Sequence, residues 1–387
     1  MRKMIAVIAD DLTGAAEIAG LGWRHGLTVE ILERDEEPSN AELVVYDADT
    51  RDCSAAKAAR RVVGIARRIN VRKPAWIYKK VDSVLRGNVL AEVEAMQKAL
   101  GVERCLLVPA NPAARRVIKN GKYFVRGKPI NQTDFRHDPA HPRRSANVKE
   151  LLGVTRKHRV TLRNPSARPL PDGVVVGEAA SATDVRHWAR QVDWRTLPAG
   201  GADFFSALLA RHGFRPRKAR LKPAKLAEGT TLFVSGSLAE SSVEFLDDCR
   251  SREWPVLLMP YELFAGRGRS RAHQSVWARR VVDALEQHRK VAIGIGQPTL
   301  PGRREGLRLG KILVETVKQV LAGARPDRVC VEGGSTAALL LDQLGWTRLV
   351  VECEFSTGVT GVRPPVRNGV LLVFKPGSYE WPAGVVV

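Results

Sequence analysis

Two polar stretches in the first ninety residues carry side chains that could perform chemistry. The first is Asp10-Asp11-Leu12-Thr13-Gly14, which follows the apolar run Met4–Ala9. Adjacent carboxylates at the end of a strand can accept a hydroxyl proton or bind Mg²⁺. The structural alternative is a helix cap, in which Asp11 or Thr13 accepts a backbone N–H group. Because one cap needs only one aspartate, we favour a chemical role for the pair.

The second stretch is Lys79–Asn88, with the sequence KKVDSVLRGN, which combines cations with an acid and an amide just before a predicted helix. Its Arg86 can pair with a carboxylate through two hydrogen bonds. A solvated charged turn is the alternative, but Gly87 and Asn88 add backbone freedom and side-chain donors, so we favour ligand binding. Asp49-Thr50-Arg51, which ends the preceding predicted strand, could add a second guanidinium.

Two glycine turns in the second half of the chain could bind phosphate. The predicted strand Val329–Val331 leads through Glu332-Gly333-Gly334-Ser335-Thr336 into a predicted helix. Glycines let a phosphate approach the backbone, and the helix N-terminus supplies N–H groups and a favourable dipole. A plain N-cap by Ser335 or Thr336 is the alternative. The turn Val234-Ser235-Gly236-Ser237 also follows a predicted strand, so two loops could face one nucleotide.

The first half of the chain repeats a unit of strand, polar loop and helix, which predicts a parallel sheet. The polar loops follow the carboxyl ends of the strands, where open parallel sheets bind ligands, so we expect them to meet at one crevice. Residues 115–145 are rich in turn formers and predict a hairpin excursion over that crevice. The predicted strands are Met4–Ala9, Leu43–Tyr46, Trp76–Tyr78 and Cys105–Val108, and the predicted helices are Ala15–His25, Ala55–Ile69 and 89–100.

After a less regular region at 150–230, with a hinge predicted at Arg215–Pro223, a second strand and helix series begins. The length of 387 residues also favours two domains, since single cores rarely exceed roughly 300 residues. We therefore predict an α/β protein with domains 1–220 and 225–387, each with a mostly parallel sheet flanked by helices, and a crevice between them. The second series of strands is predicted at Thr230–Val234, Pro255–Met259, Lys290–Ile295, Arg328–Val331, Arg348–Glu352 and Gly369–Phe374.

The composition narrows the class of protein. The formal net charge of +21 would suit a nucleic-acid binder, but the arginine clusters are scattered and aromatic residues make up only 6%. We favour a basic surface that attracts anionic substrates. The N-terminus has no secretory apolar region and no stretch predicts a membrane span, so we expect a cytoplasmic protein. The five cysteines are scattered and predict buried free thiols. The histidines show no metal-ligand spacing.

Taken together, these motifs resemble those of the four-carbon acid sugar kinase family, whose members phosphorylate threonate, erythronate or related oxo-tetronates with ATP. The resemblance spans nearly the whole chain. It rests on the sequences IADDLTGA, DTR, KKVDSVLRGN, PANPAARRV, GKYFVRGKPINQT, SGS, EGGSTA and FKPGS.

The resemblance implies that the first domain holds a sugar acid and the second holds ATP, with Mg²⁺ bridging the phosphates. Asp10 or Asp11 would accept the hydroxyl proton. The metal ligands and the oligomeric state stay open. The implied substrate contacts, with Thr13 and Asn88 added from the pattern of residues, are Thr13, Arg51, Lys80, Asp82, Arg86 and Asn88. The implied nucleotide contacts are Ser237, Gly333, Gly334, Ser335, Thr336 and Gly358.

Three positions depart from the family pattern. Ser335 stands where relatives usually carry an acid, Arg115 replaces a glycine, and Phe355–Val362 matches only loosely. Two alternatives therefore stay open, a non-catalytic relative that binds sugar acid and nucleotide, and a basic nucleic-acid-binding protein. The sequence does not select the sugar acid or the hydroxyl that is phosphorylated.

Overall fold

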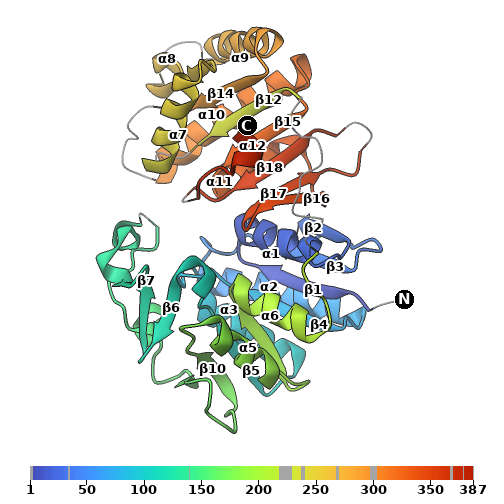
Figure 1. Cartoon of the computed structure of the whole chain (residues 1–387), viewed down its shortest axis with the longest axis vertical. Coiled ribbons are helices and arrows are strands. Elements are labelled where there is room, and N and C mark those ends of the chain that lie inside the picture. The colour runs from blue at the N-terminus through green and yellow to red at the C-terminus, as the bar shows by residue number, and fades with distance from the viewer. Residues whose placement is uncertain are drawn as a thin grey trace. The chain divides into compact units, whose positions relative to one another are not determined.

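The computed structural model describes residues 3–386 except 34, 139, 218–228, 237–239, 267–269, 297–302, 367–368 and 378. The chain divides into two compact units, Met1–Arg217 (unit 1) and Lys218–Val387 (unit 2). Each unit is an α/β structure in which helices pack against a set of mostly parallel strands (Figure 1).

The sheet of unit 1 is parallel, with the strand order β2-β3-β1-β4-β11-β5-β10-β9. The central strand β1 is apolar along its whole length and buried at every position, as expected for a strand covered on both faces. The strands are β1 (Ile5–Ala9), β2 (Val29–Glu33), β3 (Leu43–Asp47), β4 (Trp76–Lys80), β5 (Arg104–Val108), β9 (Val160–Arg163), β10 (Gly173–Gly177) and β11 (Thr196–Gly200).

Helices cover both faces of this sheet, with α2 and α3 packed together and α1, α5 and α6 forming a second group (Figure 1). In α2 the buried positions Ala58, Val62, Ile65 and Ile69 recur at helical spacing, so the apolar stripe faces the sheet and the arginines face outward. The helices are α1 (Leu12–Arg24), α2 (Ala55–Val71), α3 (Val89–Leu100), α5 (Ala182–Gln191) and α6 (Ala202–Arg211).

The predicted excursion at 115–145 is confirmed. It begins with a separate antiparallel sheet of β6 (Arg116–Lys119), β7 (Lys122–Val125) and β8 (Lys128–Pro129). The 3₁₀ turns Ile130–Gln132 and Asp134–His137 follow, and the short helix α4 (Val148–Leu151) comes after them.

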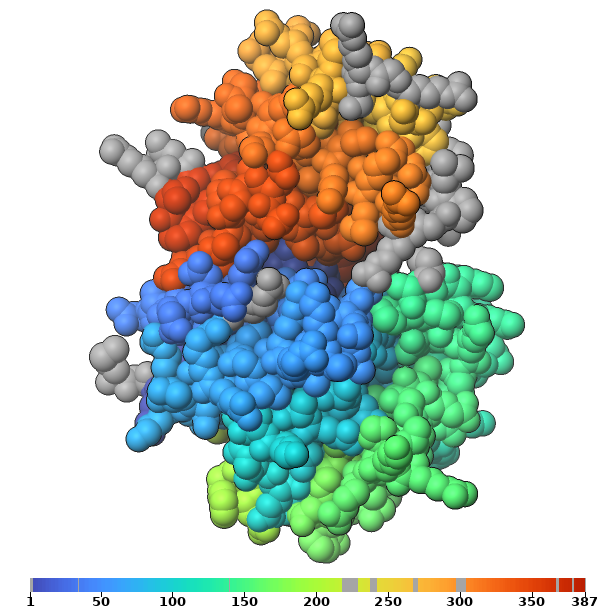
Figure 2. All heavy atoms as spheres, turned by 180° about the vertical axis from the view of Figure 1, so that it is seen from behind, coloured from blue at the N-terminus to red at the C-terminus, as the bar shows by residue number. Residues whose placement is uncertain are grey.

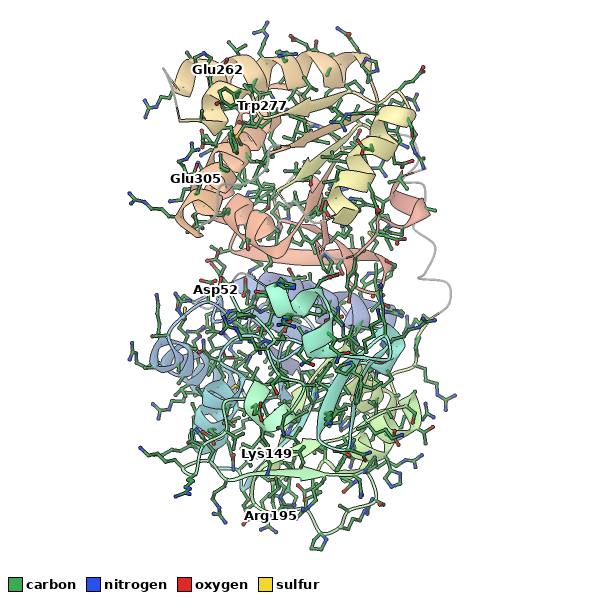
Figure 3. All side chains as sticks on the ribbon, turned by 90° about the vertical axis from the view of Figure 1, so that its left-hand side faces the viewer. Asp52, Lys149, Arg195, Glu262, Trp277 and Glu305 are labelled. Carbon is green, nitrogen blue, oxygen red and sulfur yellow. The ribbon has the colours of Figure 1, made fainter. Side chains whose placement is uncertain are left out.

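Unit 2 has the strand order β13-β14-β12-β15-β18-β17-β16, in which β17 is antiparallel to both neighbours and the first five strands are parallel. Its core includes Phe233 and Cys330, and Trp277 of α9 is fully buried with its indole N–H directed to Leu257 O (Figure 3). The strands are β12 (Thr231–Ser235), β13 (Val256–Leu258), β14 (Lys290–Gly294), β15 (Arg328–Glu332), β16 (Arg348–Ser356), β17 (Val359–Arg363) and β18 (Leu371–Lys375). The helices are α7 (Glu240–Ser251), α8 (Tyr261–Phe264), α9 (Ser270–Gln287), α10 (Arg303–Gly323), α11 (Gly334–Leu344) and α12 (Ala383–Val386).

Several sequence predictions need correction. The third strand does not end at Tyr78 but continues through Lys79 and Lys80, so these lysines lie in β4 and not in a loop. The region from residue 150 onward contains three strands and two helices where little regular structure was predicted, and its strand β11 inserts between β4 and β5. The strands β2 and β17 were also missed.

The five cysteines are free thiols, as predicted, and four of them are buried, but Cys53 is partly exposed and not buried as predicted. In the described part of the chain, no helix combines the length and the apolar character needed to cross a membrane.

Candidate functional site

The predicted acidic and basic loops of unit 1 converge at the carboxyl edge of its sheet. Strand β1 lies between β3 and β4, with Ala9 in register with both Asp47 and Lys80, so the loops that follow these strands begin side by side. Figure 3 shows Asp52, which follows β3, and Arg195, which precedes β11, at opposite ends of unit 1.

Arg51 joins the two adjacent aspartates. Its Nε lies 2.7 Å from Asp10 Oδ2 and its Nη1 lies 2.5 Å from Asp11 Oδ2, while Nη2 lies 3.7 Å from Asp82 Oδ1. The backbone N–H groups of Thr50 and Arg51 also donate to Asp10 O at 2.9 and 3.2 Å. The carboxylate pair and the DTR turn therefore form one rigid cluster.

The two aspartates differ in which oxygens are occupied. Asp11 Oδ1 accepts the Gly14 N–H at 2.8 Å and caps α1, so the capping role considered as an alternative is present, but it uses only one oxygen. Asp10 is 4% exposed, and within the described part of the chain its Oδ1 has no hydrogen-bond partner. A buried carboxylate oxygen without a partner is costly unless a ligand or water supplies a donor. Asp10 Oδ1 is thus the oxygen that a substrate hydroxyl could contact.

The electrostatics of the aspartates also differ. Burial favours the neutral form of Asp10, but the Arg51 and Lys79 cations outweigh burial and hold the pKa of Asp10 below its ordinary value. Burial raises the pKa of Asp11, and the charge of Asp10 adds to the rise although Arg51 opposes it. Asp10 therefore stays ionised at neutral pH.

The loop after β4 is organised by Asp82 and Arg86. The Arg86 Nε and Nη2 groups donate to the two oxygens of Asp82 at 3.0 and 2.9 Å, a two-point pair of the kind expected for guanidinium. Burial would raise the pKa of Asp82, but Arg86 and Arg51 hold it well below its usual range. Gly87 has a φ of 80°, and a Cβ there would lie 3.1 Å from Arg51 O, so glycine lets this loop pack against the DTR turn.

Lys80 and Asn88 lie at the site but bind other parts of the protein. Lys80 is 3% exposed, with its Nζ 3.1 Å from Glu17 Oε2 beneath the first turns of α1. Burial alone would lower the pKa of Lys80, but Glu17 and the two aspartates raise it. Asn88 Nδ2 donates to Thr50 O at 3.0 Å and to Cys53 O at 2.8 Å. Both side chains hold the loops in place.

Thr13, the remaining predicted substrate residue, is half-buried in the first turn of α1.

Two acids at the site were not predicted from the sequence. They are Glu17, the partner of Lys80, and Asp47, which ends β3. Asp47 accepts the Asp49 N–H at 2.9 Å, and burial together with the acids nearby raises the pKa of Asp47 to about 8. The sequence feature that could have identified Asp47 is an acidic residue directly after the apolar run of β3, the strand that pairs with β1.

The excursion is fastened to these loops. Arg86 Nη1 donates to Asp138 Oδ2 at 3.0 Å, Arg143 Nη1 donates to Leu85 O at 2.8 Å, and His141 Nε2 lies 2.9 Å from Asp52 Oδ1. Figure 2 shows the surface of the excursion, in green, beside the blue surface of the loop and helix that follow β3. The excursion also bounds a pocket of about 450 Å³, lined by Arg136, His137, Asp138, Pro142 and Arg144.

The two glycine turns of unit 2 lie against each other. A Cβ on Gly236 would lie 2.0 Å from Thr336 Oγ1, so the turn after β12 touches the first turn of α11. Gly333, with a φ of 92°, is the N-cap of α11, and no described side chain caps this helix. The N-cap alternative for Ser335 and Thr336 is therefore wrong, and the first N–H groups of α11 keep the capacity to bind an anion.

The remaining predicted nucleotide residues are placed as follows. Gly334 begins α11, Ser335 is exposed beside it, and Thr336 is buried. Gly358, with a φ of 83°, lies in the turn between β16 and β17, where a Cβ would be 2.8 Å from the ring of Tyr379. Ser237 lies outside the described residues.

Among the residues that the structure describes, no group of three His, Cys, Asp or Glu side chains is arranged to hold a metal ion.

Comparison with known proteins identifies the family to which the chain belongs. The family model described as "Sugar-binding N-terminal domain" matches residues 5–208. The D-threonate kinase of Bordetella bronchiseptica is 30% identical over 97% of this chain and 94% of its own. The chain belongs to the four-carbon acid sugar kinase family. The 3-oxo-tetronate kinase of Methylobacterium radiotolerans, another relative, is 23% identical over 98% of this chain and 97% of its own.

Solved structures share the fold of this four-carbon acid sugar kinase family member. A crystal structure from Salmonella typhimurium LT2 superposes with a TM-score of 0.80 at 18% identity, covering 99% of this chain and 98% of that one. The Haemophilus influenzae protein HI1011 has a TM-score of 0.73 at 19% identity, with 98% of each chain covered. At these identities the likeness supports the α/β fold.

Proposed function

We propose that this protein is an ATP-dependent kinase that phosphorylates a hydroxyl group of a four-carbon sugar acid of the threonate, erythronate or 3-oxo-tetronate type. The observation that carries the proposal is the unpartnered, buried Oδ1 of Asp10 beside Arg51, within a segment that matches a sugar-binding family model. Relatives that match 97% and 98% of the chain are named D-threonate kinase and 3-oxo-tetronate kinase, which supports the same reaction.

In unit 1, the ionised Asp10 would accept the hydrogen bond, and then the proton, of the substrate hydroxyl. We favour Asp10 over Asp11 as the base, because the oxygens of Asp11 already accept hydrogen bonds from Gly14 N and Arg51. Arg51 and Arg86 are held by aspartates, and a guanidinium has five N–H donors in a fixed fork, so the N–H groups that the aspartates do not use could bind the carboxylate of the substrate. Lys80 and Asn88 act by holding the loops.

In unit 2, the backbone N–H groups after Gly333 and at Gly236 would contact the phosphates of ATP, helped by the dipole of α11. The close contact of Gly236 with Thr336 leaves no room for a side chain and fits a cradle for phosphate. Mg²⁺, when bound with ATP, would neutralise the charge of the phosphates. Catalysis would rest on positioning and charge compensation.

The decisive experiment is a screen for ADP release with Mg-ATP and each of D-threonate, L-threonate, D-erythronate and the 3-oxo-tetronates, with the product identified by phosphorus NMR. We expect one acid to stimulate ADP release well above the rate with ATP alone. Release of ADP that is independent of every acid would refute the proposal. Binding of ATP and an acid without turnover would instead identify a non-catalytic relative. Because the reaction consumes ATP, we propose that it takes place in the cytoplasm.

A further inference from the structure

A buried charged cluster lies directly beneath the glycine turns of unit 2. The last residues of three neighbouring strands form one rung, with Ser235 of β12 in register with Glu332 of β15, and Glu332 in register with Lys375 of β18. The next residue on two of these strands is a glycine of the proposed phosphate cradle, Gly236 or Gly333. The rung therefore lies one residue from the cradle on both of these strands.

Glu332 is the centre of the cluster. It is 1% exposed, and its Oε1 lies 2.8 Å from Lys375 Nζ and accepts the Ser242 hydroxyl at 2.6 Å. Its Oε2 accepts the Ser235 hydroxyl at 3.2 Å. These partners come from α7 and from β12 and β18, the two strands on either side of β15. A buried charge is tolerated when it is paired and hydrogen-bonded in this way.

Lys375 extends the cluster to the end of the chain. Besides Glu332, its Nζ donates to Pro376 O at 3.2 Å and to Tyr379 O, which occupies the three N–H donors of an ammonium group. The Trp381 ring lies 5.3 Å from the same nitrogen. The ring of Tyr379 in turn packs against Gly358. Lys375 also fixes the cradle through its backbone, because its carbonyl accepts the Gly333 N–H at 2.9 Å.

The charges matter as well as the contacts. A carboxylate one residue before Gly333 would repel a phosphate bound at the N-terminus of α11, and the repulsion would be strong in a buried setting. The ammonium of Lys375 at 2.8 Å cancels that charge. A buried ion pair adds little to stability compared with an apolar pair, but it can fix one geometry among several.

We propose that Glu332 and Lys375 are positioning residues that hold the Gly236 and Gly333 turns in the arrangement that binds nucleotide phosphates. This inference rests on the proposed function of unit 2. Neither residue contacts the nucleotide in this assignment. Their effect on catalysis passes through the backbone of the two turns.

The test compares K375M, E332Q and the double variant E332Q/K375M with a matched control, K290M. Lys290 begins β14, at the end of the parallel strands of unit 2 that lies opposite the glycine turns. It resembles Lys375 because its Nζ donates to a carbonyl oxygen, Val386 O, and lies 4.6 Å from the ring of Trp254. Thermal unfolding, KM for Mg-ATP and KM for the sugar acid are measured for each variant, at a temperature at which all of them are folded.

We expect K375M to raise the KM for ATP by about 10–100-fold, by analogy with the loss of a partner that orients a metal ligand, with the KM for the sugar acid within about twofold of wild type. The double variant should recover part of the ATP affinity, because it removes the uncompensated carboxylate. K290M should lower the unfolding temperature without changing either KM.

Three results would overturn the inference. The first is an unchanged KM for ATP in K375M, and the second is a parallel rise of both KM values. The third is a K290M variant with the same ATP defect. If K375M does not fold, S242A removes a single hydrogen bond to Glu332 and should raise the KM for ATP alone, and an unchanged KM in S242A and E332Q would then refute the proposal. If the wild-type protein shows no affinity for ATP, the proposed function fails and this inference fails with it.

Discussion

Asp10→Asn is the substitution that most directly tests the chemistry. The new asparagine side chain can keep its carbonyl oxygen toward Arg51 Nε, which lies 2.7 Å from the present Oδ2 of Asp10. The amide nitrogen then replaces Oδ1, the oxygen without a partner, so a hydrogen-bond donor stands where the substrate hydroxyl would donate. The substitution changes one atom and one charge, and it leaves the shape of the site nearly intact.

The structure sets the expected size of both effects. Loss of a general base typically costs about 10²–10⁴ in rate, and here the replacement also turns an acceptor into a donor. A hydrogen bond between charged partners contributes about 1.5–3 kcal/mol, but the asparagine keeps a neutral version of it and relieves the burial of a charge. We therefore expect a loss of about 1 kcal/mol of stability, or an unfolding temperature lower by about 2–4 °C.

The assay is the steady-state rate of acid-dependent ADP release, with thermal unfolding measured in parallel. Asp11→Asn is the matched control, since it makes the same atomic change one residue away on a side chain whose oxygens are already occupied. We expect its kcat to fall by about tenfold at most. Equal rates for wild type and Asp10→Asn would refute the reasoning, and so would a larger loss in Asp11→Asn than in Asp10→Asn.

The remaining predictions concern a cation, a glycine and a partly buried acid. Arg86→Lys keeps the charge but loses both the two-point pair with Asp82 and the guanidinium fork proposed to bind the substrate carboxylate. The KM for the sugar acid should therefore rise about tenfold or more with the KM for ATP unchanged, and a change in ATP affinity alone would contradict the prediction. A valine at Gly236 would clash with Thr336, so Gly236→Val should weaken ATP binding at least about tenfold. Gly64→Val is the control, because a side chain there meets no neighbouring atom, and it should leave ATP binding unchanged. Calorimetry with ATP measures both affinities, and equal affinities would contradict the prediction. The pKa of Asp47 is raised to about 8 in the folded protein, so the folded protein keeps a proton on Asp47 that the unfolded chain releases above about pH 4. The contribution of Asp47 to the free energy of unfolding therefore decreases as the pH rises from about 4 to 8. Asp47→Asn should therefore be more stable than wild type at pH 8–9, by about 1–2 kcal/mol after allowance for its partial exposure, and as stable at pH 4; unfolding curves with identical pH dependence would refute this.

The convergence of Asp10, Arg51 and Arg86 could be predicted from sequence because it follows from a simple rule. The carboxyl ends of neighbouring parallel strands meet at one edge, and each of these residues comes soon after an apolar run. The role of Lys80 could not be predicted in the same way. A pair of lysines normally marks a turn, and here the acids Glu17 and Glu92, supplied by helices, help Lys80 and Lys79 to lie buried in a strand.

Two further differences have physical causes. The strand β11 has the sequence TLPAG, whose proline and glycine are typical of a turn, yet it lies buried in the middle of the sheet because tertiary burial outweighs local preference. The capping alternatives could not be settled from sequence either. Asp11 does cap α1, whereas α11 begins at Gly334 with Gly333 as its N-cap and without a described side-chain cap, and both depend on backbone angles that composition does not reveal.

The place of β11 also bears on how the protein is made. Strands β4 and β5 are complete by residue 108, but neither can pair on its inner edge until residues 196–200 insert between them. Synthesis at about 5–20 residues per second would leave both edges unpaired for roughly 5–20 seconds on the ribosome. Unpaired strand edges are templates for aggregation, so the nascent chain passes through a vulnerable interval that ends only with its last inserted strand. A stalled or truncated product ending before Thr196 would keep both edges open and should be cleared or aggregate.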